Sequence, residues 1–314
     1  MTKRPLGKSG IAIEPLMLGS NVFGWTADEA ASFAVMDAFV AEGFTAIDTA
    51  DAYSRWVPGN DSESERIIGR WMKARGNRDR VIIATKVGSD MGQGRRDLRA
   101  SWIMTAVEDS LRRLQTDVID LYQTHWPDPA TPEEETLTAY DALIKAGKVR
   151  AIGCSNYDVN LLSNALKLAA TKDLPRYQTL QNEYNLYSRR SYEGPVQDMV
   201  LAEGMSAITY YGLASGFLTG KYRSAADFGQ SQRGGGMAKY LDKRGLAILA
   251  AMDAVAARTG ASLAEIALAW IVAQPGIAAP IASATSVRQL ESLAKGARMQ
   301  LSAEDLAALT QAGV

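Results

Sequence analysis

The feature that most constrains this chain is an alternation along its length. Short apolar runs rich in β-branched residues alternate with longer stretches of helical period. Eight such runs are expected to be strands, at residues 16–20, 44–50, 81–87, 118–125, 149–155, 178–184, 206–212 and 277–283. Because each strand leads into a helix and no linker interrupts the series, the pattern predicts an α/β fold, a single (β/α)8 TIM barrel over residues 1–314.

The ends of several elements carry local signals. Residues 28–43 form a helical pattern that ends at Gly43, and residues 62–76 begin with Ser62 and Glu65, the spacing of a capping box. Residues 3–16 alternate around a Lys-Ser-Gly turn and predict an N-terminal β-hairpin. Residues 302–314 predict a C-terminal helix capped by Ser302.

Charge and cysteine content narrow the classes of partner. Lys and Arg total 34 against 35 for Asp and Glu, without a basic tract, so no nucleic acid partner is expected. The single cysteine, Cys154, excludes an internal disulfide. No apolar run approaches the roughly 20 residues of a membrane span, and no secretion signal is recognisable. We therefore expect a soluble, cytoplasmic protein with no membrane partner; a homo-oligomer stays open.

Polar side chains gather where three neighbouring strands end. Residues 45–54 place Asp48, Asp51 and Tyr53 within six positions, Lys86 ends the next run, and His125 ends the one after. Taken singly, each has an ordinary structural explanation as a turn, packing or surface residue. Together they fall on the carboxyl-terminal rim where catalysis occurs in barrels, which favours an active site. One histidine and one cysteine without ligand spacing argue against a metal site.

The chemistry suited to this set is proton donation to a carbonyl oxygen. A tyrosine with a pKa near 10 is a poor acid unless positive charge stabilises its phenolate, which Lys86 can supply. Asp48 would keep the lysine charged, and His125 would donate or accept a hydrogen bond in the same pocket. The complementary step is hydride attack on the carbonyl carbon, which requires a nicotinamide or flavin cofactor.

At these residues the sequence resembles the aldo-keto reductases, over nearly its whole length. The family's signatures are recognisable as GFTAIDTADAYS, ESERIIGRW, VIIATKVG, IDLYQTHWPD, LIKAGKVRAIGCSNY, QNEYNLYSR and GFLTGKY. The resemblance implies a barrel with a nicotinamide dinucleotide across its carboxyl-terminal rim. It implies an oxidoreductase that reversibly reduces an aldehyde or ketone to an alcohol with hydride from NADPH. The catalytic tetrad then falls on Asp48, Tyr53, Lys86 and His125, with Tyr53 as the proton donor.

The resemblance also implies the residues that hold the dinucleotide. Ser155, Asn156 and Gln181 would bind the nicotinamide carboxamide, and Tyr210 would stack on the nicotinamide ring. A group after Tyr210 would wrap the pyrophosphate: Gly212, Leu213, Ser215, Gly216, Leu218 and Lys221. A further group would hold the adenosine end: Ser283, Thr285, Arg288 and Gln289.

Two segments depart from the family pattern. Tyr211 and Gly212 replace a small polar residue and a proline that are common in relatives, and Ser283 to Ser286 replace a segment that usually carries a basic residue. A 2′-phosphate favours a fixed cation, and Arg288 is the nearest one in sequence. The resemblance favours NADP(H) as the cofactor, because members of the family commonly use it, and NAD(H) stays open.

The sequence says less about the identity of the substrate than about the reaction. Phe23, Trp25, Trp56 and Trp126 fall near the catalytic group and predict an apolar or ring-shaped small-molecule pocket, although core packing would explain some of them. Residues 222–240 lack periodicity and are expected to form a mobile loop over the cofactor or a simple insertion.

Two other functions fit a barrel of this kind. Lys86 would serve a Schiff-base aldolase if its pKa were depressed, which a neighbouring Asp48 would oppose. A non-enzymatic alternative is a regulatory subunit like the potassium-channel β subunits, which share the fold and bind NADPH. Turnover of a carbonyl compound separates both from a reductase.

Overall fold

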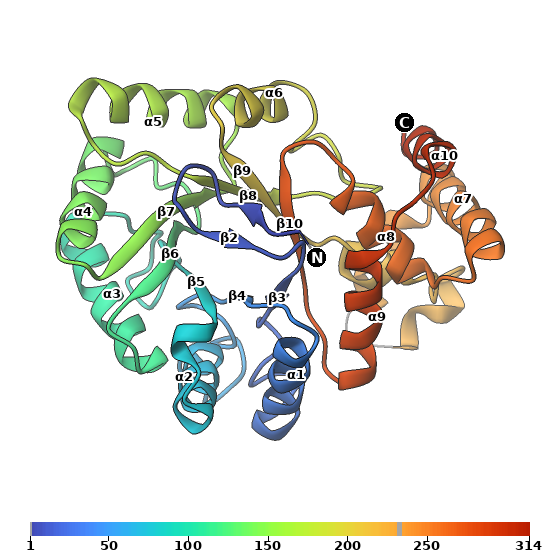
Figure 1. Ribbon diagram of the computed structural model, residues 1–314, viewed down its shortest axis with the longest axis horizontal. Coiled ribbons are helices and arrows are strands. Elements are labelled where there is room, and N and C mark those ends of the chain that lie inside the picture. Colours follow the sequence, from blue (N-terminus) through green and yellow to red (C-terminus); the bar gives the residue numbers. More distant parts are fainter. Residues whose placement is uncertain (1, 231–233) are drawn as a thin grey trace.

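Eight parallel strands close into a barrel in the computed structural model, which describes residues 2–230 and 234–314. The strands follow one another around the barrel in chain order, and β10 pairs with β3 to close it (Figure 1). They are β3 (Met17–Gly19), β4 (Ala46–Asp48), β5 (Ile82–Val87), β6 (Ile119–Thr124), β7 (Val149–Ser155), β8 (Thr179–Glu183), β9 (Ser206–Tyr210) and β10 (Ile277–Ala282). The predicted (β/α)8 barrel is confirmed.

A ring of helices surrounds the barrel, one after each strand. They are α1 (Glu29–Ala41), α2 (Glu63–Arg75), α3 (Ala100–Leu114), α4 (Glu133–Lys145), α5 (Val159–Lys172), α6 (Pro195–Ala202), α8 (Leu263–Val272) and α9 (Val287–Arg298). Two additional helices, α7 (Lys243–Thr259) and α10 (Ala303–Ala312), lie together outside the ring (Figure 1). An ion pair between Arg258 and Asp305 joins them.

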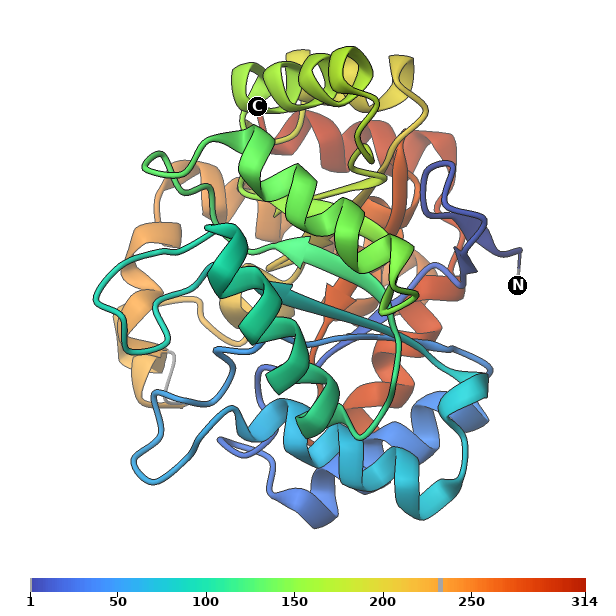
Figure 2. The same cartoon turned by 90° about the vertical axis from the view of Figure 1, so that its left-hand side faces the viewer.

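The N-terminal hairpin closes one end of the barrel. Its strands β1 (Arg4–Pro5) and β2 (Ala12–Ile13) pair antiparallel, as predicted. Leu6, Ile11 and Ile13 are buried in the same apolar cluster as inward-facing strand residues such as Leu121. Figure 2 shows the hairpin at one end of the molecule and the long loops after β4 and β5 at the other. The hairpin therefore seals the amino-terminal end and leaves the carboxyl-terminal rim as the open one.

Most expected boundaries lie within two residues of the observed ones. The Ser302 cap is confirmed, since its hydroxyl accepts a hydrogen bond from the Asp305 N–H at 3.0 Å. The run 206–212 stops as a strand at Tyr210, because Tyr211 has a left-handed backbone with φ of 55° that cannot continue a strand.

The predicted capping box at Ser62 is wrong. Ser62 itself has φ of 56°, and its buried hydroxyl makes no hydrogen bond to the helix. Glu65 cannot reach back to it, because its carboxylate accepts hydrogen bonds from Thr85 Oγ1 and Arg113 Nε, both at 2.6 Å. A capping box occurs instead at the start of α8, between Ser262 and Glu265.

The segment 222–240 was expected to form a mobile loop over the cofactor or a simple insertion. Residues 231–233 lie outside the described residues. The rest is a series of short 3-10 turns at Ala225–Gln230, Gly234–Gly236 and Ala238–Tyr240. The Tyr240 side chain is buried, and Arg223 forms an ion pair with Asp253 of α7 at 2.8 Å. The described part of this segment is therefore packed against the barrel's outer helices.

Within the described ranges, no single helix is long and apolar enough to cross a membrane; α7 and α8 meet that test only jointly, across a bend of 99°.

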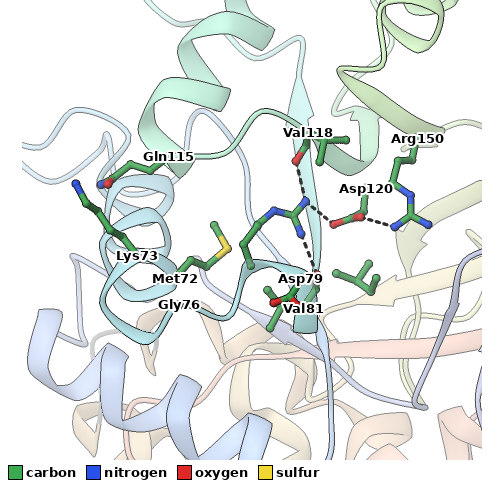
Figure 3. Close-up of a pocket in the computed structure, with 11 residues that line it drawn as sticks. Met72, Lys73, Gly76, Asp79, Val81, Gln115, Val118, Asp120 and Arg150 are labelled. Atoms are coloured by element: carbon green, nitrogen blue, oxygen red, sulfur yellow. Dashed lines mark hydrogen bonds and ion pairs between the residues drawn. The ribbon is translucent and has the colours of Figure 1, made fainter.

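A cavity of about 740 Å³ opens at the amino-terminal ends of β5, β6 and β7, opposite the carboxyl-terminal rim (Figure 3). Asp120 lies on its wall and accepts hydrogen bonds from Arg78 and Arg150, each at 2.8 Å. Arg78 also donates to the carbonyl groups of Val81 and Val118. These charged groups bond to one another and to backbone carbonyl groups where the strands begin. The cluster therefore links β5, β6 and β7 at this end of the barrel.

Candidate active site

Lys86 occupies the centre of the carboxyl-terminal rim. Its ammonium donates hydrogen bonds to Asp48 Oδ2 at 2.7 Å, to the Thr49 carbonyl at 2.8 Å and to Tyr53 Oη at 3.0 Å. Lys86 and Asp48 are buried, whereas Tyr53 is partly exposed. The strand ends of β4 and β5 therefore assemble a carboxylate, an ammonium and a phenol in one line, with the phenol nearest to solvent.

The pKa values of this group follow from burial and charge. Burial raises the pKa of Tyr53 above its ordinary value, although the Lys86 charge works in the opposite direction. Burial alone would lower the pKa of Lys86, but Asp48 and Tyr53 outweigh it and the pKa lies above its ordinary value. At neutral pH the lysine is therefore charged and the tyrosine carries its proton.

His125 completes the group from the end of β6. Its ring centroid lies 5.9 Å from that of Tyr53 at an interplanar angle of 78°, and its Nδ1 lies 3.0 Å from Ser89 Oγ. Burial, with smaller contributions from Lys86 and Arg96, lowers the pKa of His125 well below its ordinary value. The imidazole is therefore neutral, and it offers one N–H donor and one acceptor beside the phenol.

Two buried amides hold Asp48. Gln181 Nε2 donates to Asp48 Oδ1 at 3.0 Å, and Gln123 Nε2 lies 3.5 Å from the same oxygen. Gln181 was expected at the nicotinamide carboxamide, yet its amide is engaged with the catalytic carboxylate. Gln123 was missed by the sequence reasoning. The period-two alternation of β6 could have found it, because Gln123 lies on the same inward face as Leu121.

The residues expected at the nicotinamide lie together beside this group. Asn156, with φ of 62°, donates through Nδ2 to the His125 carbonyl at 2.9 Å and accepts from the Tyr210 hydroxyl at 2.7 Å. Ser155 Oγ donates to the Gln181 carbonyl at 2.6 Å. These contacts link the ends of β6, β7, β8 and β9 into one polar surface.

A cavity of about 960 Å³ opens at this rim. Most of the expected site residues line it: Trp25, Asp48, Tyr53, Trp56, His125, Trp126, Ser155, Asn156, Gln181, Tyr210, Gly212, Leu213, Ser215, Gly216, Lys221, Ser283, Thr285 and Gln289. Tyr211, Ser89 and Ser292 also line it, although they were not among the expected site residues. The cavity therefore runs from Tyr53 to the first turn of α9.

Four of the expected residues are outside this lining. Lys86 is buried and donates a hydrogen bond to Tyr53, which lines the cavity. The side chains of Phe23 and Leu218 are fully buried in the apolar core between sheet and helices. Phe23 therefore does not offer its ring to a substrate, whereas the backbone N–H contact expected of Leu218 does not depend on its side chain. Arg288 is exposed in the first turn of α9.

The geometry fits a dinucleotide at several points. Tyr210 presents its ring at the end of β9, and Ala214, Ser215 and Gly216 have left-handed backbones that curl the chain along the cavity wall beside Lys221. Concave backbone of this kind is a common anion site. At the far end, Gln289 Oε1 accepts hydrogen bonds from the Thr285 N–H at 2.9 Å and hydroxyl at 3.1 Å.

Comparison with known proteins identifies one family and several relatives of this chain. The sequence pattern of the Aldo/keto reductase family matches residues 15–313. Protein tas of Escherichia coli strain K12 is 33% identical, over 95% of this chain and 94% of that protein. Aldo-keto reductase YhdN of Bacillus subtilis is 35% identical, over 95% and 87%. A probable voltage-gated potassium channel subunit beta of Oryza sativa is 31% identical, over 92% and 89%.

Proposed function

This chain belongs to the aldo/keto reductase family of oxidoreductases, and from that premise we propose that it reduces an aldehyde or ketone to the alcohol with hydride from NADPH, reversibly. The observation that carries the proposal is the buried Lys86 ammonium, which is held between Asp48 and Tyr53, two residues that line the rim cavity. That arrangement places a protonated phenol where a carbonyl oxygen can reach it.

A nicotinamide held by Ser155, Asn156 and Tyr210 would supply hydride to the carbonyl carbon. As negative charge develops on the carbonyl oxygen, the Tyr53 hydroxyl gives it a proton. The Lys86 ammonium, 3.0 Å from Tyr53 Oη, stabilises the phenolate that is left. The neutral imidazole of His125 orients the carbonyl oxygen by hydrogen bonding, and Asp48, held by Gln181, fixes the position of Lys86.

Replacing Lys86 by Met is expected to remove most of the activity and to move the alkaline limb of the pH profile upward. The reason is that Lys86 is the charge that lowers the pKa of Tyr53, so without it the pKa rises further. The measurement is kcat/KM between pH 6 and pH 10. Lys86→Met leaves Asp48 buried and unpaired, so Lys86→Met with Asp48→Asn serves as the control for damage to the fold. An unchanged profile would show that Lys86 does not tune the phenol.

We propose NADP(H) rather than NAD(H) as the physiological cofactor, with Arg288 as the contact to the 2′-phosphate. Arg288→Ala is then expected to weaken NADPH binding by about 1.5–3 kcal/mol, the scale of a charge-assisted hydrogen bond, and to leave NADH binding unchanged. Fluorescence titration measures both. Lys295→Ala, an exposed cation two turns later on α9, is the matched control. Equal affinity of the unmodified protein for the two dinucleotides contradicts the assignment.

The alternatives make different predictions. A Schiff-base aldolase needs a neutral amine, and the raised pKa of Lys86 opposes that role. A regulatory nicotinamide-binding subunit is suggested by the Oryza sativa relative, and would bind NADPH without turning over any carbonyl compound. A panel of aldehydes and ketones assayed with NADPH separates it from the reductase. Cytoplasmic location is likewise a proposal, and the oligomeric state stays open.

A further inference from the structure

Two aromatic side chains at the mouth of the rim cavity are unusually exposed. Within residues 2–230 and 234–314, Trp56 and Tyr211 are the aromatic side chains that stay about half exposed, at 51% and 48%. Both line the same cavity as Tyr53. They come from different parts of the rim, since Trp56 follows β4 and Tyr211 follows β9. Apolar rings left open toward a catalytic cavity are typical of a ligand-binding wall.

Tyr211, which lines the cavity, has a strained backbone. Its φ of 55° is rare for a bulky residue and costs about 1–3 kcal/mol. Two hydrogen bonds to the Tyr211 carbonyl hold this conformation. Asn185 Nδ2 donates one at 2.9 Å, and the Ala214 N–H donates the other at 2.7 Å. Strain held in place by neighbouring contacts is characteristic of functional sites.

The two rings are also supported from behind. Tyr211 packs edge-on against Tyr210, with centroids 5.1 Å apart, and Trp56 packs edge-on against Trp25 at 5.7 Å and Tyr53 at 6.3 Å. Trp56 is therefore held directly against Tyr53, and Tyr211 lines the same cavity from the end of β9.

We propose that Tyr211, together with Trp56, selects a substrate whose carbonyl group is attached to a flat apolar ring, such as an aryl aldehyde. A flat ring buries more surface against aromatic side chains than a puckered one of equal carbon number, and aromatic pairs add a favourable term beyond area alone. This proposal rests on the proposed reductase function and names its substrate class. The reaction is the same reduction, with hydride to carbon and the Tyr53 proton to oxygen.

The test compares 2-naphthaldehyde with decahydro-2-naphthaldehyde, its saturated counterpart. Tyr211→Ala is expected to lower kcat/KM about tenfold for the flat aldehyde and less than about twofold for the saturated one. Tyr211→Phe keeps the ring and is expected to keep the preference. Trp56→Ala should act in the same direction as Tyr211→Ala. Leu246→Ala, an exposed residue of α7 outside the cavity, should change neither value.

A binding measurement separates failure of this proposal from failure of the reductase function. The complex with NADPH cannot oxidise an alcohol, because its nicotinamide is already reduced. Calorimetry of that complex with 2-naphthylmethanol and with its saturated counterpart therefore measures the preference without turnover. Absence of turnover for every carbonyl compound overturns the reductase function. In that case, tighter binding of the flat alcohol that is lost in Tyr211→Ala still supports selection by Tyr211 and Trp56. Equal affinity for both alcohols, or a Tyr211→Phe variant as impaired as Tyr211→Ala, overturns it.

Discussion

Replacing Tyr53 by Phe is expected to lower kcat/KM for any accepted carbonyl compound by about 10²- to 10⁴-fold, the usual contribution of a positioned general acid. The substitution removes only the hydroxyl that receives the Lys86 hydrogen bond, while the ring contacts with Trp56 and His125 can persist. Dinucleotide affinity should change little, because the phenol donates its proton to the substrate. Steady-state kinetics and a fluorescence titration measure the two effects.

A second tyrosine provides the matched control for Tyr53. The Tyr187 hydroxyl bonds to the Lys239 carbonyl and to Asp242 at the surface, away from the rim cavity. Tyr187→Phe should retain the activity of the unmodified protein. If Tyr53→Phe kept its turnover as well, Tyr53 would have to be removed from the mechanism.

Asp51→Asn is expected to stabilise the protein at alkaline pH, by at most about 1.4 kcal/mol for each pH unit between the unfolded and the folded pKa of Asp51. Asp51 is buried, and neither of its carboxylate oxygens has a hydrogen-bond partner among the described residues. Burial, followed by the charge of Glu65, raises the pKa of Asp51 to about 8, against the opposing charges of Arg113 and Lys86. A carboxyl group with a pKa near 3.9 in the unfolded chain would therefore resist ionisation in the folded one.

The direction of the pH dependence follows from proton linkage. Between about pH 4 and pH 8 the folded protein keeps the Asp51 proton and the unfolded chain loses it, so stability falls by at most about 1.4 kcal/mol per pH unit. This loss of stability is absent below about pH 4 and has reached its full size above about pH 8. Asparagine cannot ionise, so Asp51→Asn should remove this slope. Urea unfolding at pH 5, 7 and 9 measures it.

Asp128 supplies a control of opposite sign. Hydrogen bonds from Thr131 and from backbone N–H groups lower the pKa of Asp128 despite its burial. The ionised Asp128 carboxylate therefore stabilises the folded protein above the pKa that it has in the unfolded chain, and this stabilisation is lost as the pH falls. Asp128→Asn should accordingly destabilise the protein most at neutral and alkaline pH. Parallel stability curves for Asp51→Asn and the unmodified protein would show that Asp51 ionises freely in the folded state.

The placement of the catalytic side chains could be predicted because it depends on local pattern. Period-two and helical runs identify strands and helices, and eight successive units leave few alternatives to a barrel. Once the strands are assigned, the ends that carry Asp48, Lys86 and His125 must meet on one rim. The structure confirms the barrel and brings Tyr53 within 3.0 Å of Lys86 Nζ.

The partners of those side chains were decided only by the tertiary structure. Gln181 lies 133 positions from Asp48 in the sequence yet binds its carboxylate, and Glu65 bonds to Arg113 instead of closing a capping box. Phe23 is buried in the core, although its position beside the rim suggested a substrate contact. Local pattern specifies which face of an element is apolar. It does not specify which distant group satisfies a buried polar atom, because that choice depends on the three-dimensional packing of elements far apart in the chain.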